Sequence, residues 1–450
     1  CMLKKIRVIM AVVVLLAATA LFVDFTGRAA SLWGWLAKIQ FIPAVLAMNV
    51  AVVAGLIAMT LIFGRLYCSV ICPLGVFQDA VSRIGGWFAP KAKCKAGRFG
   101  YRKGLTWLRG VLLAVFVVLT LAGLTSIAAL IAPYSAFGRM VTALVRPLYV
   151  WGNNELAAYA ESVGSYDVYA VEPAIVSPVL ITVALVTLGV VGVMAWMGGR
   201  SYCNTVCPVG SVLGFLARYS WLRPVIDTAK CNGCGSCARH CKASCINAKK
   251  HEIDYSRCVT CFDCMDHCRT GALKYAPRRG GSRVATDDGV PTDDGRRKFV
   301  GLTALLAGGA AVKAAEKFAD GGLAEIEPKS APERKTPIVP HGAMSVANFN
   351  QHCVECQLCV NNCPNQVLRP STKLDDGFLR PVMNYDRGFC RPECVKCSEV
   401  CPAGAIHPVT VAEKSSVSIG YAVVDLDNCL SATGISACGK CAAKCPAAAI

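Results

Sequence analysis

The stretch Gly64-Arg65-Leu66-Tyr67-Cys68-Ser69-Val70-Ile71-Cys72-Pro73-Leu74-Gly75 returns 135 residues later as Gly199-Arg200-Ser201-Tyr202-Cys203-Asn204-Thr205-Val206-Cys207-Pro208-Val209-Gly210. Each copy follows an apolar stretch, which predicts two parallel repeats related by a pseudo-twofold axis along a membrane normal. Each proline suits the first position of a helix, so the preceding cysteine lies at a positive helix N-terminus that favours thiolate. We expect the four cysteines of the two copies to meet in one metal site with four thiolate ligands: Cys68, Cys72, Cys203 and Cys207.

An iron–sulfur cluster is the occupant that we expect at this four-cysteine site. The alternative is a pair of membrane-edge turns with unligated or disulfide-bonded thiols. A cytoplasmic face disfavours disulfides, and the duplicated spacing favours a metal.

Four apolar stretches without a charged side chain are long enough to cross a bilayer: residues 8–23, 39–63, 110–132 and 174–199. Basic residues gather before the first stretch and between the second and third, whereas acidic residues predominate between the third and fourth. The positive-inside rule then places the N-terminus and both cysteine motifs in the cytoplasm. Residues 1–225 are therefore predicted to form a polytopic α-helical domain of four spans in a bacterial inner membrane.

The composition agrees with a membrane protein and argues against a nucleic-acid-binding one. Hydrophobic residues make up 54% of the 450-residue chain and charged residues 17%, which excludes a disordered chain. The formal charge of +18 counts the 27 cysteines as neutral. A cluster with four thiolates carries about −2, so five clusters remove roughly ten charges, and membrane topology explains the remaining basic excess.

Residues 226–276 carry the strongest motif, two runs of the form Cys-x2-Cys-x2-Cys-x3-Cys. This spacing is typical of α+β ferredoxin-like domains with two [4Fe–4S] clusters, in which the fourth cysteine of each run ligates the other cluster. Zinc is the competing metal. We expect Cys268 to complete the first site and Cys241 the second, with Cys245 near enough to be a substitute ligand. The eight predicted ligands are Cys231, Cys234, Cys237, Cys241, Cys258, Cys261, Cys264 and Cys268.

Residues 346–450 carry three further runs and are predicted to hold three more [4Fe–4S] clusters. The spacing leaves open which fourth cysteine belongs to which cluster. No Cys-x-x-Cys-His occurs and no histidine lies in the apolar stretches, so we expect five [4Fe–4S] clusters, a sixth site from the duplicated motif, and no haem. The twelve predicted ligands are Cys353, Cys356, Cys359, Cys363, Cys390, Cys394, Cys397, Cys401, Cys429, Cys438, Cys441 and Cys445.

A linker, residues 277–345, separates the two ferredoxin regions. Within it, residues 295–313 contain Arg296-Arg297 followed by an Ala- and Gly-rich apolar run. This pattern is typical of a twin-arginine export signal, which would carry the last domain to the periplasm. The alternatives are a basic patch before a surface helix and a polyferredoxin held wholly in the cytoplasm.

Together these motifs resemble a known quinol-dehydrogenase module. Residues 1–276 look like the membrane-bound NapH-type ferredoxin subunit, and residues 296–450 resemble the periplasmic NapG-type ferredoxin, here fused in one chain. The resemblance implies that electrons pass from quinol to a periplasmic reductase system. NapG-type proteins usually have four cluster motifs, so either the module is shortened or the native chain continues past Ile450.

The sequence therefore predicts an electron-transfer subunit rather than a complete enzyme, with quinol, the lipid bilayer and other respiratory subunits as partners. A quinol site is expected near residues 68–83 and 203–218, where Asp79 is the one carboxylate available to take a quinol proton. A maturation or regulatory factor of the NosR kind is the alternative. The sequence names no terminal acceptor and assigns no role to Cys1 or Cys94.

Overall fold

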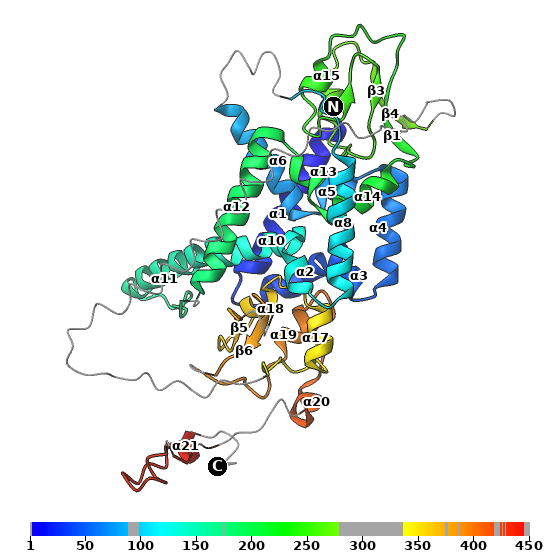
Figure 1. Ribbon diagram of the computed structural model, residues 1–450. Helices are drawn as coiled ribbons and strands as arrows, with labels where there is room; N and C mark the ends of the chain where they lie inside the picture. The colour runs from blue at the N-terminus through cyan, green and yellow to red at the C-terminus, as the bar shows by residue number, and fades with distance from the viewer. Residues whose placement is uncertain are drawn as a thin grey trace, which may run out of the picture. The chain divides into compact units, whose positions relative to one another are not determined.

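The computed structural model describes residues 2–88, 99–173, 176–278, 336–373, 377–385, 388–417, 424, 426–427 and 429–444. The chain divides into two compact units, Cys1–Arg278 with Pro337–Ile450, and Arg279–Thr336. Only Thr336 of the second unit is described, so every element below belongs to the first unit (Figure 1).

Two helices of the described residues are long and apolar enough to cross a membrane, α1 (Met2–Val23) and α12 (Pro178–Gly198). They match the first and last of the four predicted stretches. Two further apolar helices, α4 (Val50–Phe63) and α8 (Thr106–Leu121), are shorter than the roughly 20 residues that a spanning helix needs.

The two middle stretches are not the continuous helices that their composition suggests. Residues 39–63 divide into α3 (Phe41–Leu46) and α4, because Asn49 caps α4 by accepting a hydrogen bond from the Val52 amide. Residues 110–132 divide into α8 and α9 (Thr125–Ile131) at Gly123, whose φ of 76° ends the first helix.

The tyrosine of each cysteine motif forms a hydrogen bond at a break between two helices. The Tyr67 hydroxyl donates to Gln40 Oε1 at 2.9 Å, between α2 (Arg28–Lys38) and α3. The Tyr202 hydroxyl donates to the Ile131 carbonyl at 2.8 Å, directly before a 79° bend. Three elements follow that bend: α10 (Pro133–Met140), the π-helix η1 (Val141–Val145) and α11 (Arg146–Ser162).

Each cysteine motif forms a short helix, a turn and a second helix. As the N1 preference of proline predicts, the second helix begins at the proline of each motif. The four elements are α5 (Leu66–Val70), α6 (Pro73–Trp87), α13 (Ser201–Thr205) and α14 (Pro208–Ala217).

The first cysteine-rich region, residues 222–278, is closed by β1 (Leu222–Ile226), which pairs antiparallel with β4 (Leu273–Pro277) in the register Leu222 to Pro277. Inside this ribbon, β2 (Ile246–Asn247) pairs antiparallel with β3 (Glu252–Ile253). The short helices α15 (Ser236–Arg239) and α16 (Asp263–Asp266) carry the third cysteine of each run.

The second cysteine-rich region is described over residues 336–417 with its gaps. Its strands β5 (Leu368–Pro370) and β6 (Pro381–Met383) pair antiparallel. Its helices are α17 (Val346–His352), α18 (Leu358–Asn361), α19 (Lys396–Val400) and α20 (Val411–Ser416), and α21 (Lys440–Lys444) follows.

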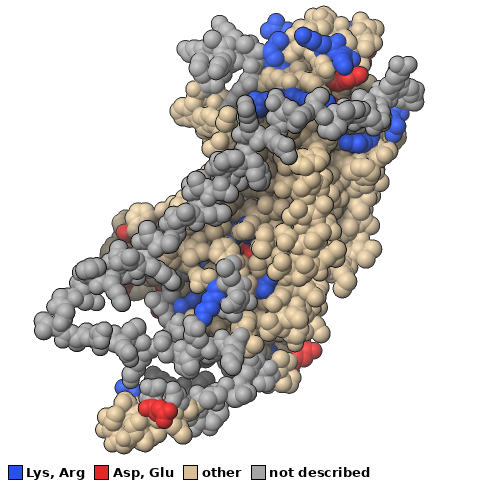
Figure 2. Space-filling model, viewed as in Figure 1, with Lys and Arg blue, Asp and Glu red and all other residues tan. Residues whose placement is uncertain are grey.

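Helix α1 contacts both cysteine-rich regions. Near its start, Lys4 bonds Asp266 of the first region at 2.8 Å. Near its end, the Phe22 ring lies beside Gly138, which also abuts the carbonyl of Cys356 in the second region. The 22 residues of α1 extend about 33 Å. Figure 2 shows Lys and Arg gathered over the first region and few charges on the visible helices.

Candidate metal centres

Three of the cysteine runs share one loop geometry. In each run the residues directly before and after the second cysteine have positive φ, which lets the loop turn its cysteines and amides inward. Glycine suits this conformation in the first run, whereas larger residues adopt it in the other two. The pairs are Gly233 and Gly235, Thr260 and Phe262, and Glu355 and Gln357, with φ between 50° and 71°.

In the first region, the structure groups the cysteines around two cavities. One cavity is lined by the first three cysteines of run one together with Cys268. The other is lined by the first three cysteines of run two together with Cys241. This exchange of the fourth cysteine is the arrangement that the two-cluster spacing predicts. The sets are Cys231, Cys234, Cys237, Cys268, and Cys258, Cys261, Cys264, Cys241.

In the second region, where the spacing leaves the fourth ligands open, the electrostatic neighbours of two thiols indicate the same exchange. Burial raises the pKa of Cys359, with further increases from Cys356, Cys353 and Cys401 and a smaller one from Cys397. Burial raises the pKa of Cys397 to about 12, with further increases from Cys390, Cys363 and Cys394. We therefore divide the eight cysteines into two sets. The inner set is Cys353, Cys356, Cys359 and Cys401, and the outer set is Cys363, Cys390, Cys394 and Cys397.

The four cysteines of the duplicated motif are also brought together. Each is about 3% exposed. Burial raises the pKa of the Cys207 thiol, and Cys203, Cys72 and Cys68 raise it further because each disfavours a second negative charge nearby. The Gly210 amide donates to the Cys207 sulfur at 3.4 Å, and Gln78 Nε2 donates to the Cys203 sulfur at 3.1 Å.

Two buried arginines brace the motifs across the repeat. Arg200 Nη1 donates to the Cys68 carbonyl at 2.6 Å, and Arg65 Nη2 donates to the Cys203 carbonyl at 3.2 Å. The space for each arginine depends on the glycine two residues after the Cys-Pro pair. A Cβ on Gly75 would lie 2.6 Å from Arg200 Nη1, and one on Gly210 would lie 2.9 Å from Arg65 Nη2.

The surroundings of Asp79 do not suit the proton-accepting role that the sequence suggested. Its carboxylate accepts two hydrogen bonds from Arg200, at 2.8 Å each, and also pairs with Arg7. Although burial opposes ionisation, Arg200, Lys242 and Arg7 hold the pKa of Asp79 far below its usual range. A carboxylate held ionised in this way is a poor base, so Asp79 acts as the centre of an ion-pair cluster.

Lys242 extends this cluster to the first region. Its ammonium lies 3.8 Å from Asp79 and 2.9 Å from Asp263, and its carbonyl accepts from the Arg200 amide at 2.9 Å. Lys242 occupies the position after Cys241, where ferredoxins of this spacing usually have proline. The substitution therefore provides a direct contact between the region and the helices.

Cys245 lies among the ligands expected for the second cavity. Its sulfur is 3.5 Å from that of Cys241, and it also interacts with Cys258. Cys245 is 1% exposed, which makes it more buried than any of the four expected ligands around it.

Other predicted residues are not assembled by the part of the chain described. Cys429, Cys438 and Cys441 are described, but Cys445 is not, so their site has no described geometry. Cys1, Cys94 and Arg296-Arg297 also lie outside the described residues.

The grouped thiols fit a four-iron cluster by their number and, in the first region, because each group lines one cavity. Within the described residues, no three His, Cys, Asp or Glu side chains are close enough to hold a single metal ion. A cube of four irons spaces its cysteine sulfurs farther apart than one ion does. Each group supplies the four thiolates that a [4Fe–4S] cluster requires.

A family model described as a 4Fe-4S binding domain matches residues 45–93 and 180–227, which contain the two copies of the duplicated motif. The ferredoxin-type protein MauM of Paracoccus denitrificans is 31% identical over 155 residues, covering 34% of this chain and 68% of MauM. The chain belongs to the NapG- and MauM-like ferredoxin-type proteins. The matched family model is one of 4Fe-4S binding, in agreement with the cysteine groups described above.

Two further relatives agree. NapG of Escherichia coli is 31% identical over 157 residues, which is 34% of this chain and 64% of NapG. MauM of Methylobacillus flagellatus is 31% identical over 128 residues, which is 28% of this chain and 53% of that protein. The chain thus spans about half to two thirds of these relatives. No solved structure matches it.

Sequence reasoning missed Glu355, a buried carboxyl between two cysteines of the inner set. Burial raises its pKa to about 7, although Ser126, Arg139 and Arg380 oppose the shift. Its position between Val354 and Cys356 gives no local sign of a functional residue. The Glu355 carboxyl becomes buried only because this loop packs on the helices.

Proposed function

We propose that the protein takes electrons from quinol and conducts them through [4Fe–4S] clusters, across the membrane, to a redox partner on the side of its second cysteine-rich region. The observation that carries this proposal is the contact of α1 with both regions, through Lys4 to Asp266 of the first and through packing on α18 of the second. A helix that spans a bilayer separates its ends by about 30 Å. Regions attached to opposite ends of such a helix would face opposite sides of the membrane.

The arrangement of cysteine groups supports a conducting series. In each region one group is buried towards the helices, with Thr260 Oγ1 bonding the Phe63 carbonyl in the first region and Ser135 Oγ bonding the Val354 carbonyl in the second. The other group is more exposed, with Cys234 open to solvent in the first region. Three cysteines of the duplicated-motif group, Cys68, Cys72 and Cys207, share one hydrophobic core with cysteines of both regions. Bound clusters would supply one-electron transfer at each position.

An apolar cavity of about 190 Å³ provides a place for quinol beside this series. An apolar cavity of about 150 Å³ holds a benzene ring, so this one has room for a quinol headgroup. It touches Cys353 of the inner set and Pro208, which follows Cys207. Of the two segments expected to form the quinol site, only the second contributes, through Pro208, Val209 and Val212.

The chain's own residues have defined tasks in this mechanism. Gln78 and the Gly210 amide hold the sulfurs of the duplicated motif. Lys414, from α20, donates to the Cys390 sulfur at 3.2 Å and to the Cys394 carbonyl at 2.7 Å, and so stabilises negative charge on the outer set. Thr125 lines the cavity and ties it to the second region through the Asn350 carbonyl at 2.6 Å.

Filling the cavity tests the quinol role. Leu113 of α8 lines the cavity, and Val118 of the same helix is 63% exposed. In purified protein with its clusters, Leu113→Trp should slow cluster reduction by added quinol at least tenfold. Val118→Trp should leave the rate unchanged, and dithionite should reduce both variants fully. Equal rates of quinol reduction in both variants would overturn the assignment of this cavity.

A further inference from the structure

Tyr134 presents a buried hydroxyl beside the second cysteine-rich region. It is the second residue of α10, just after the bend at Ala132, and its side chain is 3% exposed. Among the residues that the structure describes, its hydroxyl has no hydrogen-bond partner. A buried hydroxyl without a partner costs free energy, and native proteins seldom leave one so.

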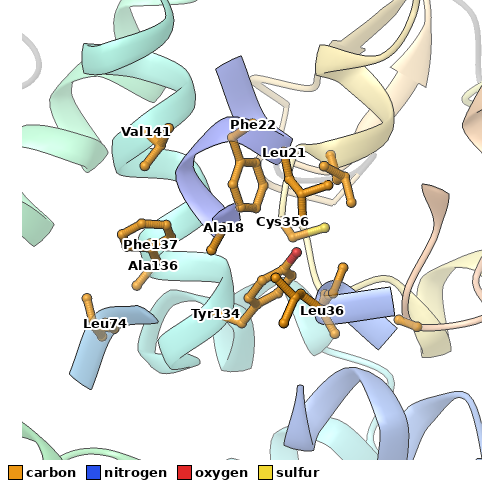
Figure 3. Packing of buried hydrophobic residues seen from close by; sticks show 14 of the residues in the cluster. Ala18, Leu21, Phe22, Leu36, Leu74, Tyr134, Ala136, Phe137, Val141 and Cys356 are labelled. Carbon is orange, nitrogen blue, oxygen red and sulfur yellow. The ribbon is translucent and has the colours of Figure 1, made fainter. Parts of the chain in front are cut away.

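The hydroxyl faces the inner cysteine set of the second region. Figure 3 shows the Tyr134 oxygen directed towards the Cys356 sulfur. Cys356 and Cys401, two members of that set, are the thiols that affect it electrostatically. The ring is held in place by Phe22, whose centroid lies 5.7 Å away at an interplanar angle of 49°.

The same turn leads directly to the duplicated-motif group. The carbonyl of Ile131, three residues before Tyr134, accepts from the Tyr202 hydroxyl at 2.8 Å. Tyr202 in turn is flanked by Cys203 and Cys207. The turn at residues 131–134 is therefore linked to one cysteine group through Tyr202 and to another through Tyr134. The Tyr202 hydroxyl has a backbone partner, whereas among the described residues the Tyr134 hydroxyl has none.

We propose that the Tyr134 hydroxyl donates a hydrogen bond to a sulfur of the cluster held by Cys353, Cys356, Cys359 and Cys401, and so raises the reduction potential of that cluster. This inference rests on the proposed function, because it requires a cluster in the inner set. A tyrosine hydroxyl is a donor, and cluster sulfur carries more negative charge after reduction. The hydrogen bond therefore stabilises the reduced state more than the oxidised state. Tyr134 would thereby tune the potential of the cluster that receives electrons from the duplicated-motif group.

The test compares midpoint potentials of individual clusters in the full-length protein, by potentiometric titration followed by EPR. Cys356→Ser first identifies the signal of the inner cluster, which should be lost or altered. Tyr134→Phe keeps the ring and its packing on Phe22 but removes the donor. It should shift the midpoint potential of that one signal to a lower value and leave the other signals in place.

A second measurement reads the hydrogen bond itself. Pulsed EPR in deuterated buffer should detect an exchangeable proton coupled to the inner cluster, and Tyr134→Phe should abolish that coupling. Tyr255→Phe is the matched control, since the Tyr255 hydroxyl already donates to the Pro224 carbonyl at 3.0 Å. It should leave both readouts of the inner cluster unchanged.

The outcomes separate this inference from the proposed function. If Cys356→Ser retains every cluster signal, the inner set holds no cluster and the proposed conducting series fails there. If Cys356→Ser removes or alters one signal, but Tyr134→Phe changes neither the potential nor the proton coupling of that signal, the series stands. In that case the hydrogen bond is overturned, and the hydroxyl is bound by water or backbone.

Discussion

The two cysteine-rich regions share a loop geometry but attach to the helices by different forces. Salt bridges hold the first region, through Lys4 to Asp266 and through Lys242 to Asp79. Within the described residues, the second region makes no salt bridge to the helices and is held by hydrogen bonds to neutral acceptors. Examples are Arg146 Nη1 to Asn361 Oδ1 at 2.8 Å and Arg380 Nη2 to Ser126 Oγ at 2.9 Å.

This difference shows that the residues that shape a cysteine loop are distinct from the residues that attach the loop to the helices. The left-handed residues around the second cysteine recur in both regions, so they belong to the loop itself. The contacts beyond the loop are specific to each region, with Lys242 after Cys241 in one and Asn361 before Cys363 in the other. Salt weakens exposed ion pairs, but it weakens buried hydrogen bonds much less. Changing the salt concentration therefore tests the two attachments separately.

The largest expected effect concerns the side of the membrane on which each region lies. A protease site inserted at Pro337 should be cut in intact spheroplasts and release the second region, whereas a site inserted at Lys249 of the first region should be protected. All-or-none behaviour is expected because a bilayer excludes the protease. Protection of both sites until lysis would place both regions in the cytoplasm and remove the transmembrane path.

Exchange of the fourth cysteines should give the next largest effect, the loss of one cluster. Cys401→Ser should remove the inner cluster of the second region, although Cys401 belongs to the run that begins at Cys390. Cys363→Ser should remove the outer cluster instead. The inner set is mostly buried and the outer set only partly so, so a soluble paramagnetic relaxant should broaden the EPR signal of the outer cluster alone.

The reverse result would contradict the exchange. If Cys401→Ser removed the broadened signal and kept the protected one, each run would ligate its own cluster. The shared loop geometry of the two regions would then not extend to their ligand sets.

Asp79→Asn should destabilise the attachment of the first region strongly. Removing one partner of a buried ion pair costs about 3–5 kcal/mol, because Arg200 and Arg7 remain buried without their counter-charge. The Asp79 pKa is lowered in the fold, so its contribution is present at neutral pH and is lost as the pH falls below about 3.8, the unfolded value.

Hydrogen exchange of residues 256–268 gives the readout, since these backbone amides should lose protection in Asp79→Asn. Glu161→Gln, at an exposed position of α11, is the matched control and should change nothing. Unchanged protection in Asp79→Asn would mean that the ion-pair cluster does not hold the region in place.

Much of the cysteine chemistry was readable from spacing. The structure groups Cys268 with the first run and Cys241 with the second, as the two-cluster pattern predicts, and the resemblance to NapG-type proteins is confirmed by the relatives. These features depend on residues within one short segment, where the steric demands of a loop determine the spacing. The family match supports 4Fe-4S binding, whereas the number of clusters and the ligands of each stay predictions.

The features that could not be predicted from the sequence depend on contacts between distant segments. The breaks at Gln40 and Ile131 lie opposite the two motif tyrosines, and no local pattern indicates a hydroxyl 27 or 71 residues away. The pairing of Asp79 with Arg200 spans 121 residues, so composition suggested a free carboxylate where the fold supplies its counter-charges. Tyr134 and Glu355 likewise read as ordinary helix and loop residues until the second region docks on α10.

Lys4→Met should give the smallest effect and the clearest view of the contrast between the regions. Lys4 and Asp266 are partly exposed, at 21% and 33% of their side chains, and a pair of this kind contributes about 0.2–1 kcal/mol. Asp263, which lies 3.3 Å from Lys4, keeps its ion pair with Lys242 in the variant. At low salt the variant should slightly increase hydrogen exchange in residues 263–268, and high salt should remove the difference from wild type because the ions screen the pair. Arg146→Met should instead increase exchange in residues 358–363 by the same amount at low and high salt, since Asn361 is a buried neutral partner. If salt altered both variants alike, charge would hold both regions, and the two docking surfaces would not differ in kind.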